Sequence, residues 1–319
     1  TKYTFSTSVT SNQIRKKLDM NMSDKQFVST SPALFPIQGN PASATTVNVL
    51  GRDLETRTTN VQRYDYQDDI FTTGVGTDTY FSLQGGDEKT KYFASLGYLV
   101  NEGIIKNTDF KRAGAKVRLK HDFNSKLSAT VGLNYINSGS NEKPDGNVFW
   151  SPINSINITN NIYDIKQKDA NGNYLAVDPN RINPLSIIDD FKIKQNTDRI
   201  ITDLQLNYVP FKNFNADMIF GLDNYNQRGN VFIPRYTYTV NPAYYNDGYV
   251  SEATNRVVQF NNDLNLRYLY NINSNWKATT YAGYNVQTYR DNFVAIEGRN
   301  LKPFIETINA FNTLLPGSP

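Results

Sequence analysis

A repeated alternation of apolar and polar residues, with a period of two, constrains this sequence of 319 residues most strongly. After Lys126, for example, Leu127, Val131 and Leu133 alternate with small or polar residues. This period is typical of β-strands that expose one face to an apolar environment. Each segment reaches about ten residues, longer than the usual five or six of a soluble strand and close to a tilted membrane crossing. The nine segments are residues 2–9, 77–85, 90–101, 110–122, 126–137, 197–209, 213–227, 255–270 and 275–295.

The polar positions of these segments include several charges on one side of a strand. Four like charges in segment 110–122 would be costly against a packed core, but they are tolerated where they face water. We therefore expect a water-filled lumen on one side of the sheet and lipid on the other. The residues expected to face the lumen are Arg112, Lys116, Arg118, Lys120, Asp217 and Arg267. Those expected to face lipid are Leu127, Val131, Leu133, Phe214, Met218, Leu266 and Trp276.

The connections between the segments fall into two classes that alternate along the chain. Long loops are expected at 10–76, 138–196 and 228–254, with a shorter one at 102–109. Tight turns and long loops on opposite sides are typical of antiparallel outer-membrane β-barrels. The tight turns are expected at 86–89, 123–125, 210–212 and 271–274.

Two local structures are expected inside the long loops. Ser23-Asp-Lys-Gln26 matches a capping box and predicts a short helix that runs through Val28. Ala170-Asn-Gly-Asn173 is a turn signal and predicts a small hairpin.

Composition excludes several classes of function. The chain has no cysteine and a single histidine, His121, so it offers neither thiolate metal sites nor a histidine cluster. A formal net charge of +3 gives no field that would attract nucleic acid.

The adjacent acids Asp68–Asp69 and Asp189–Asp190 point apart on an extended chain, and Asp169 begins a calcium-loop pattern that lacks its glycine and glutamate. We expect no catalytic residues, no metal and no cofactor, and hence no enzyme. No apolar run approaches the 18 residues of a membrane-spanning helix, which does not argue against a barrel.

Aromatic residues in the predicted loops have no membrane belt to explain them. They could stack on sugars or contact a partner protein, or they could pack within the loops themselves. These candidate ligand- or partner-binding residues are Phe149, Trp150, Tyr236, Tyr238, Tyr244 and Tyr245.

Several short motifs resemble the SusC/RagA family of TonB-dependent outer-membrane transporters. Arg15-Lys-Lys-Leu-Asp19 resembles the segment that follows the family's first barrel strand. Tyr66-Gln-Asp-Asp-Ile-Phe71 resembles a Trp-Gln-Asp-Glu-Ile-Phe motif, from which Tyr66 and Asp69 depart. The stretches 81–86, 91–98, 102–106 and 109–112 resemble the family's most recognisable block. The resemblance is dense over residues 1–137 and weaker beyond.

The resemblance implies an all-β chain that forms about nine strands of a plugged transmembrane barrel of about 22 strands. It implies that 1–319 is the N-terminal part of the barrel domain, with the plug domain and the later strands outside this sequence. It further implies uptake of glycans or peptides across the outer membrane of a Gram-negative, Bacteroidota-type bacterium. The implied partners are a SusD-like surface lipoprotein, the TonB complex through segments outside this sequence, and outer-membrane lipid. The alternative is a surface β-protein that binds glycans or host proteins without transporting anything.

Overall fold

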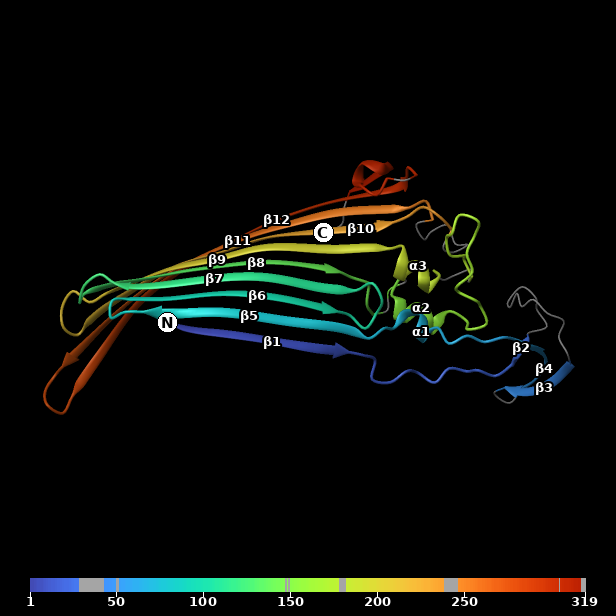
Figure 1. Cartoon of the computed structure of the whole chain (residues 1–319), viewed down its shortest axis with the longest axis horizontal. Helices are drawn as coiled ribbons and strands as arrows, with labels where there is room; N and C mark the ends of the chain where they lie inside the picture. The colour runs from blue at the N-terminus through green and yellow to red at the C-terminus, as the bar shows by residue number, and fades with distance from the viewer. Residues whose placement is uncertain are drawn as a thin grey trace.

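One antiparallel sheet of ten strands forms most of the molecule (Figure 1). The computed structural model describes residues 1–28, 43–49, 52–146, 148, 150–177, 182–237, 246–303 and 305–316. Each strand from β5 to β13 pairs with the next along the chain, and β1 pairs with β5. The strands are β1 (Lys2–Asn12), β5 (Gly74–Gly86), β6 (Thr90–Glu102), β7 (Asp109–Asp122), β8 (Leu127–Asn141), β9 (Lys192–Tyr208), β10 (Phe214–Ile233), β11 (Tyr249–Asn271), β12 (Lys277–Leu301) and β13 (Phe311–Pro316).

All nine predicted strands are confirmed, as β1 and β5 to β12. Several run further toward the long loops than predicted: β9 starts at Lys192 rather than 197, and β10 continues to Ile233 rather than 227. Neither extension alternates: residues 192–196 contain one apolar residue, Ile193, and β10 ends in the consecutive apolar residues Val231, Phe232 and Ile233. Backbone pairing continues there without the alternation. The loops predicted at 138–196 and 228–254 are therefore shorter, at 142–191 and 234–248. β13 lies beyond the last predicted segment, 275–295.

The short turns lie at one end of the sheet and the long loops at the other (Figure 1). The turns span residues 87–89, 123–126, 209–213 and 272–276. We call these the turn end and the loop end. The predicted alternation of connection lengths is thus confirmed.

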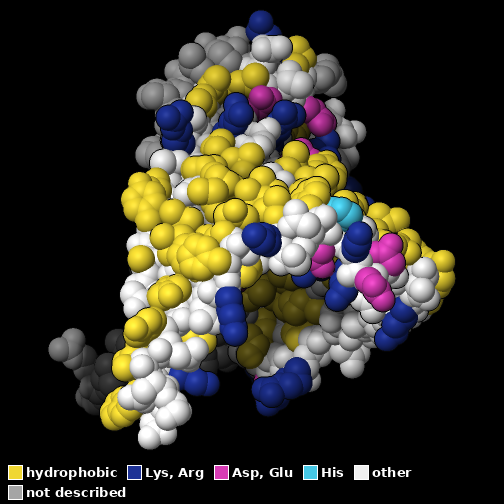
Figure 2. Space-filling model, turned by 90° about the vertical axis from the view of Figure 1, so that its left-hand side faces the viewer, with side chains coloured by type: hydrophobic (Ala, Val, Ile, Leu, Met, Phe, Trp, Pro, Cys, Tyr) yellow, Lys and Arg dark blue, Asp and Glu magenta, His cyan; other side chains and the backbone are white. Residues whose placement is uncertain are grey.

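The two faces of the sheet differ in character, because side chains alternate along every strand. One face, which we call the apolar face, includes the paired row Leu119, Val131, Leu204 and Phe220 on four neighbouring strands. The opposite face, the polar face, includes the paired row Arg118, Gly132, Asp203 and Gly221. Viewed toward the turn end, apolar side chains gather over a broad area and a hollow is bordered by lysine and arginine (Figure 2).

The apolar face is exposed across the strands. Leu96 is 61%, Val117 51% and Leu133 48% accessible to solvent. Soluble monomers rarely leave contiguous apolar surface of more than a few hundred Å² uncovered. The face therefore has the character of a surface that packs against lipid.

A second sheet of three strands lies within the long connection from β1 to β5. It contains β2 (Lys25–Val28), β3 (Ser43–Val49) and β4 (Arg52–Asn60), in the order β2-β4-β3. The helix predicted after Ser23 is therefore wrong. The Ser23 hydroxyl accepts a hydrogen bond from the Lys25 amide at 3.3 Å, which is a local turn rather than a helix cap. Lys25 then pairs with Asn60, so tertiary strand pairing overrides the capping signal.

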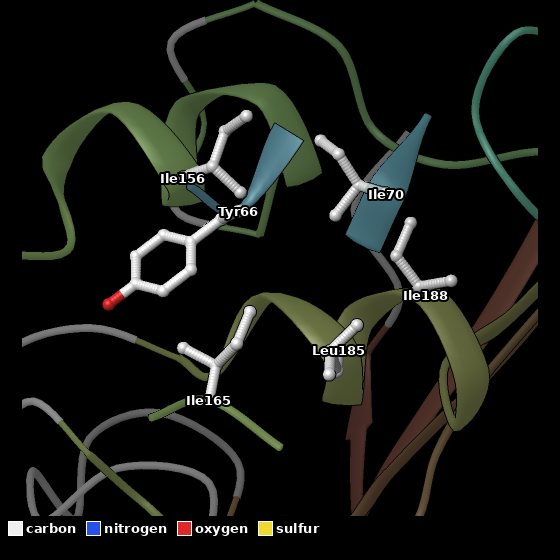
Figure 3. Packing of buried hydrophobic residues seen from close by; sticks show 6 residues of the cluster. All are labelled: Tyr66, Ile70, Ile156, Ile165, Leu185 and Ile188. Carbon is white, nitrogen blue, oxygen red and sulfur yellow. The ribbon is translucent and has the colours of Figure 1, made fainter. Parts of the chain in front are cut away.

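Three short helices pack together at the loop end (Figure 3). They are α1 (Gln67–Ile70), α2 (Pro152–Ile158) and α3 (Pro184–Asp189), and a 3-10 turn, η1 (Ile308–Ala310), precedes β13. Asn183 caps α3 by accepting from the Leu185 amide at 2.9 Å, and Pro184 starts the helix. The hairpin predicted at 170–173 is confirmed by the bridge between Lys168 and Tyr174, with Gly172 at φ 84°.

The deepest hydrophobic burial in the described residues lies in these loops. One buried cluster contains Tyr66, Ile70, Ile156, Ile165, Leu185 and Ile188. A second cluster contains Ile182, Ile187 and Phe191 from the loop, together with Ile233 and Tyr249 from the polar face of the sheet. Within the described ranges, the helices are all too short to cross a membrane.

Candidate functional site: the polar face and the loop assembly

The six residues that we expected to face a lumen share the polar face. Arg112, Lys116, Arg118 and Lys120 alternate along β7, while Asp217 lies on β10 and Arg267 on β11. The register connects them, because Arg118 is in line with Asp203, and Asp217 pairs with Asn207 on the same side. Six of the seven residues expected to face lipid lie in strands and share the apolar face. The seventh, Trp276, precedes β12 and is 68% exposed.

Charge on the polar face is divided between two groups of strands. Lys91 on β6 and the four basic residues of β7 make one side positive. The acids Asp203, Asp217, Asp223 and Asp263 lie on β9 to β11. Arg118 Nη1 joins the two groups through Asp203 Oδ1 at 3.2 Å. Arg199 forms a bidentate pair with Asp223, and Asn207 donates to Asp217 Oδ1 at 2.6 Å.

A hollow of about 780 Å³ lies over the basic strands near the turn end. Lys2, Lys91, Arg118 and Lys120 line it, together with Phe93 and several small polar residues. Four cations around one hollow attract anionic or hydrogen-bond-accepting groups. The geometry suits a wet passage or a polar contact surface rather than a catalytic centre.

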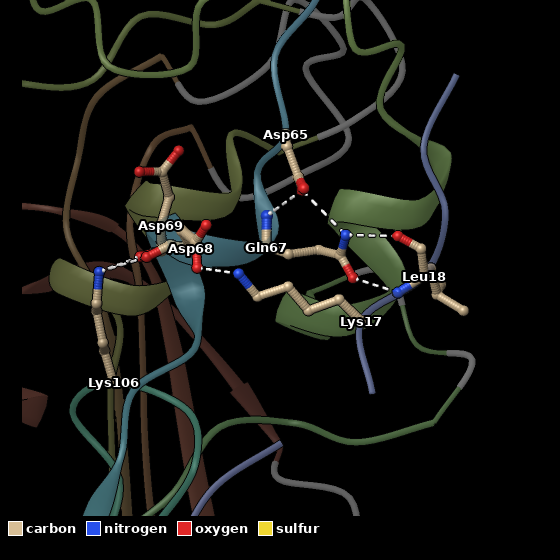
Figure 4. Close-up of polar contacts among 7 residues, drawn as sticks. All are labelled: Lys17, Leu18, Asp65, Gln67, Asp68, Asp69 and Lys106. Atoms are coloured by element: carbon tan, nitrogen blue, oxygen red, sulfur yellow. Dashed lines mark hydrogen bonds and ion pairs between the residues drawn. The ribbon is translucent and has the colours of Figure 1, made fainter. Parts of the chain in front are cut away.

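The motifs that resemble the family's motifs meet at the loop end. Gln67 Oε1 accepts from the Leu18 amide at 2.7 Å, and its Nε2 donates to the Leu18 carbonyl at 2.9 Å (Figure 4). Asp65 Oδ1 accepts from Gln67 Nε2 at 3.0 Å and from the Gln67 amide at 3.0 Å. Gln67, 2% exposed, therefore fastens the segment after β1 to α1.

The segment 102–106 joins the same junction. Lys106 Nζ donates to the carbonyls of Asp68 (3.1 Å) and Asp69 (2.7 Å), where the short helix α1 leaves its carbonyls unpaired (Figure 4). The Lys106 amide donates to the Ile70 carbonyl at 2.9 Å. Lys17 forms an ion pair with Asp68 on the opposite side. Three motifs distant in sequence thus build one structural clamp.

The adjacent acids serve as hydrogen-bond acceptors of this scaffold. Asp69 pairs with Lys166 at 2.8 Å. Asp189 accepts from Tyr174 Oη at 2.6 Å and from Asn107 Nδ2 at 3.1 Å. Burial raises the pKa of Asp190, and a hydrogen bond from Tyr236 acts in the opposite direction. Among the described residues, no group of three His, Asp or Glu side chains has the arrangement of a metal site.

Two of the six candidate aromatic residues lie within the described structure. Trp150 and Tyr236 both pack against the second buried cluster, and the Tyr236 hydroxyl donates to Asp190. Phe149, Tyr238, Tyr244 and Tyr245 lie outside the described residues. Trp150 and Tyr236 therefore contribute to loop packing. Any role for them in ligand or partner binding stays a prediction.

Lys143 is a further residue of the loop assembly that the sequence analysis missed. Its ammonium donates to the carbonyls of Ile187 (2.8 Å) and Phe191 (2.6 Å) at the end of α3. Burial lowers the pKa of Lys143 to about 8. No local sequence signal marks it, because its partners lie more than 40 residues away.

Comparison with known proteins agrees with this architecture, although no family model matches the chain. The chain is 26% identical over 254 residues to TonB-dependent receptor P39 of Formosa agariphila, covering 77% of this chain and 23% of that receptor. It is 34% identical over 100 residues to TonB-dependent receptor SusC of Bacteroides thetaiotaomicron, covering 31% of this chain and 10% of SusC. The RagAB peptide transporter matches its fold with a TM-score of 0.62 at 17% identity, over 79% of this chain and 29% of the other.

The SusC/RagA resemblance is supported. The sheet described above is a partial all-β barrel. The chain spans 23% or less of the length of the two curated receptors. The clamp of Gln67, Lys17 and Lys106 shows what these motifs do locally: they hold the loops together.

Proposed function

We propose that this chain forms part of the wall of an outer-membrane TonB-dependent importer of the SusC type. The observation that carries the proposal is a single sheet with one exposed apolar face, one charged face, and short turns and long loops at opposite ends. In this proposal the apolar face meets lipid, the polar face lines the lumen, and the loop end is extracellular. Residues 1–319 then belong to the barrel domain, in the outer membrane of a Bacteroidota-type bacterium.

The cargo in this proposal is a glycan or a peptide, and the partners are a SusD-like surface lipoprotein and the TonB complex. The similarity to SusC and to the RagAB peptide transporter supports this assignment. The loop assembly supports a recognition role, because its buried clusters hold a large surface in one shape over the polar face. In this role the chain has to bind its cargo and let the cargo pass.

Removal of loop 142–191 from the full-length protein tests the proposal. Asn141 and Lys194 are paired neighbours on β8 and β9, so a short hairpin turn can replace the loop without breaking the sheet. We expect the shortened protein to remain in the outer-membrane fraction while lipoprotein co-purification or uptake of cargo decreases. Unchanged uptake together with unchanged co-purification would contradict a recognition role for the loop.

Fractionation separates the importer from a surface protein that only binds. An importer should be extracted from outer membranes only with detergent, and growth on its cargo should require an intact TonB system. Release by salt or urea without detergent would favour the binding protein and contradict the barrel.

A further inference from the structure

The edge of the apolar face slants across the sheet. The paired row Leu96, Ala115, Tyr135 and Ile200 is apolar from β6 to β9. It then continues through Asn224 on β10 and Val258 on β11 to Arg290 on β12, so two of its last three residues are polar. A second row passes through Leu119, which lies four residues closer to the turn end than Ala115 along β7. This row reaches Val286 on β12 and is apolar except for Asn262 on β11. Strands that cross a membrane at a tilt produce this stagger. The slanted edge therefore marks one plane parallel to the membrane.

A band of cations follows this edge on its loop-end side. Lys111 on β7 and Arg228 on β10 share one paired row. Arg256 on β11 lies in the row through Ala113, which is two residues closer to the turn end than Lys111 along β7. Arg290 lies in the row through Ala115, which is four residues closer than Lys111. Lys194 on β9 lies on the same face. We call these five exposed cations the outer cation band. From β10 to β12 its members, Arg228, Arg256 and Arg290, descend in step with the apolar edge.

The outer cation band carries more positive charge than the acids around it neutralise. Within the part of the chain that the structure describes, none of its five members forms an ion pair. Four acids, Glu102, Asp109, Asp198 and Glu252, share this stretch of the face. Asp198 already accepts from Tyr135 Oη (2.9 Å) and Asn137 Nδ2 (2.8 Å), and Asp109 accepts from Asn141 Nδ2 at 2.5 Å. Five cations against four acids leave a surplus of one positive charge.

A depression of about 340 Å³ lies within the band. Its lining includes Tyr98, Lys111, Asn141, Lys194 and Asn196, together with one acid, Asp109, which accepts a hydrogen bond from Asn141. Gly139 keeps it open, since a Cβ there would lie 2.8 Å from the Asn196 amide oxygen. Tyr98 marks the apolar edge, and the lysines and amides on the loop-end side can bind phosphate and sugar hydroxyls.

We propose that the outer cation band binds the phosphorylated sugar headgroup of a glycolipid in the outer leaflet, with Lys111 and Lys194 on its phosphate. The inference rests on the proposed barrel, because only that placement puts the apolar edge at the headgroup level. Free phosphate offers the same charge, but it lacks the acyl chains that would cover the apolar face below the depression. The lipid headgroup is therefore the occupant that satisfies both parts of this surface.

The test uses the full-length protein, purified in mild detergent, and a bis-phosphorylated glucosamine lipid (lipid A) as the probe. The variant is Lys111→Gln/Lys194→Gln, and the matched control is Lys126→Gln/Lys212→Gln, which removes two lysines from the turn end. Because each surface cation contributes to anionic-lipid attraction, loss of both lysines should weaken binding roughly thirtyfold. The control should bind like the unmodified protein, and Lys111→Arg/Lys194→Arg should restore binding. Native mass spectrometry measures the bound lipid.

Three outcomes would overturn the inference. Equal binding by the variant and the control would remove Lys111 and Lys194 from the site. Equal binding of dephosphorylated lipid, or full competition by millimolar inorganic phosphate, would contradict headgroup recognition. A protein that is absent from outer membranes would overturn both this inference and the proposed function, whereas a membrane-inserted protein with unchanged lipid binding would overturn this inference alone.

Discussion

Gln67 binds both backbone groups of Leu18, accepting from its amide at 2.7 Å and donating to its carbonyl at 2.9 Å. The side-chain amide of Gln67 thus pairs with the N–H and the C=O of one residue 49 positions earlier in the chain. Residues that pair between two strands exchange hydrogen bonds in the same way. Since Gln67 is buried, these hydrogen bonds have no water to replace them. The contact explains why a glutamine follows the aromatic residue of this motif.

Gln67→Leu should loosen the junction between the segment after β1 and α1. The change leaves the Leu18 backbone groups without partners, at a cost of about 1–3 kcal/mol. Cleavage of residues 13–24 by added protease in intact cells should accelerate. The control is Asp68→Asn, which removes only the exposed ion pair with Lys17 and should cost less than about 1 kcal/mol. Equal protease sensitivity in both variants would contradict a structural role for Gln67.

Val131→Arg should destabilise the inserted sheet. Val131 lies in the middle of the apolar face and is 47% exposed, so we expect a cost of about 2–4 kcal/mol in a refolding assay into lipid vesicles. Asn134→Arg, on the polar face of the same strand, is the control and should cost little. A cost near zero at Val131 would reverse the assignment of the faces.

Ile188→Ala should open the loop assembly while the sheet stays inserted. Ile188 is 1% exposed in the first buried cluster, and loss of its side chain should cost about 2–5 kcal/mol. Hydrogen exchange over 152–158 and 184–189 should accelerate, with β7 and β8 unchanged. The exposed Ile158, which is 39% accessible, provides the control as Ile158→Ala. Uniform acceleration through the strands would show that the loops do not fold as a separate unit.

The local stability of α3 should rise as the pH increases from about 8 toward 10.5, the interval between the folded and ordinary pKa of Lys143. In this interval the unfolded segment binds more protons than the folded one, because burial lowers the pKa of Lys143 when folded. Hydrogen exchange at 184–189, corrected for the intrinsic effect of pH, measures the rise. Lys143→Met should abolish the pH dependence and, by leaving two carbonyls unpaired, increase exchange at every pH. A pH response that persists in Lys143→Met would assign it to another group.

The sequence by itself determined the sheet and its two faces. Side chains alternate with a period that depends only on strand geometry, so Val131 and Arg118 could be assigned to opposite faces without knowledge of their neighbours. The turn and loop ends followed from connection lengths alone. The six charged residues expected on one face share it for the same reason.

The tertiary structure alone decided the loops. A strand and not a helix follows Ser23 because β4 offers backbone partners to Lys25–Val28, and a capping signal worth about 1 kcal/mol cannot outweigh strand pairing. The cluster around Tyr66 joins segments more than 80 residues apart, and the cluster around Phe191 joins segments more than 40 residues apart. No periodic pattern in the sequence indicates either cluster. Lys143, Gln67 and Lys106 act on backbone carbonyls and amides, which every residue carries and which therefore leave no mark in the sequence.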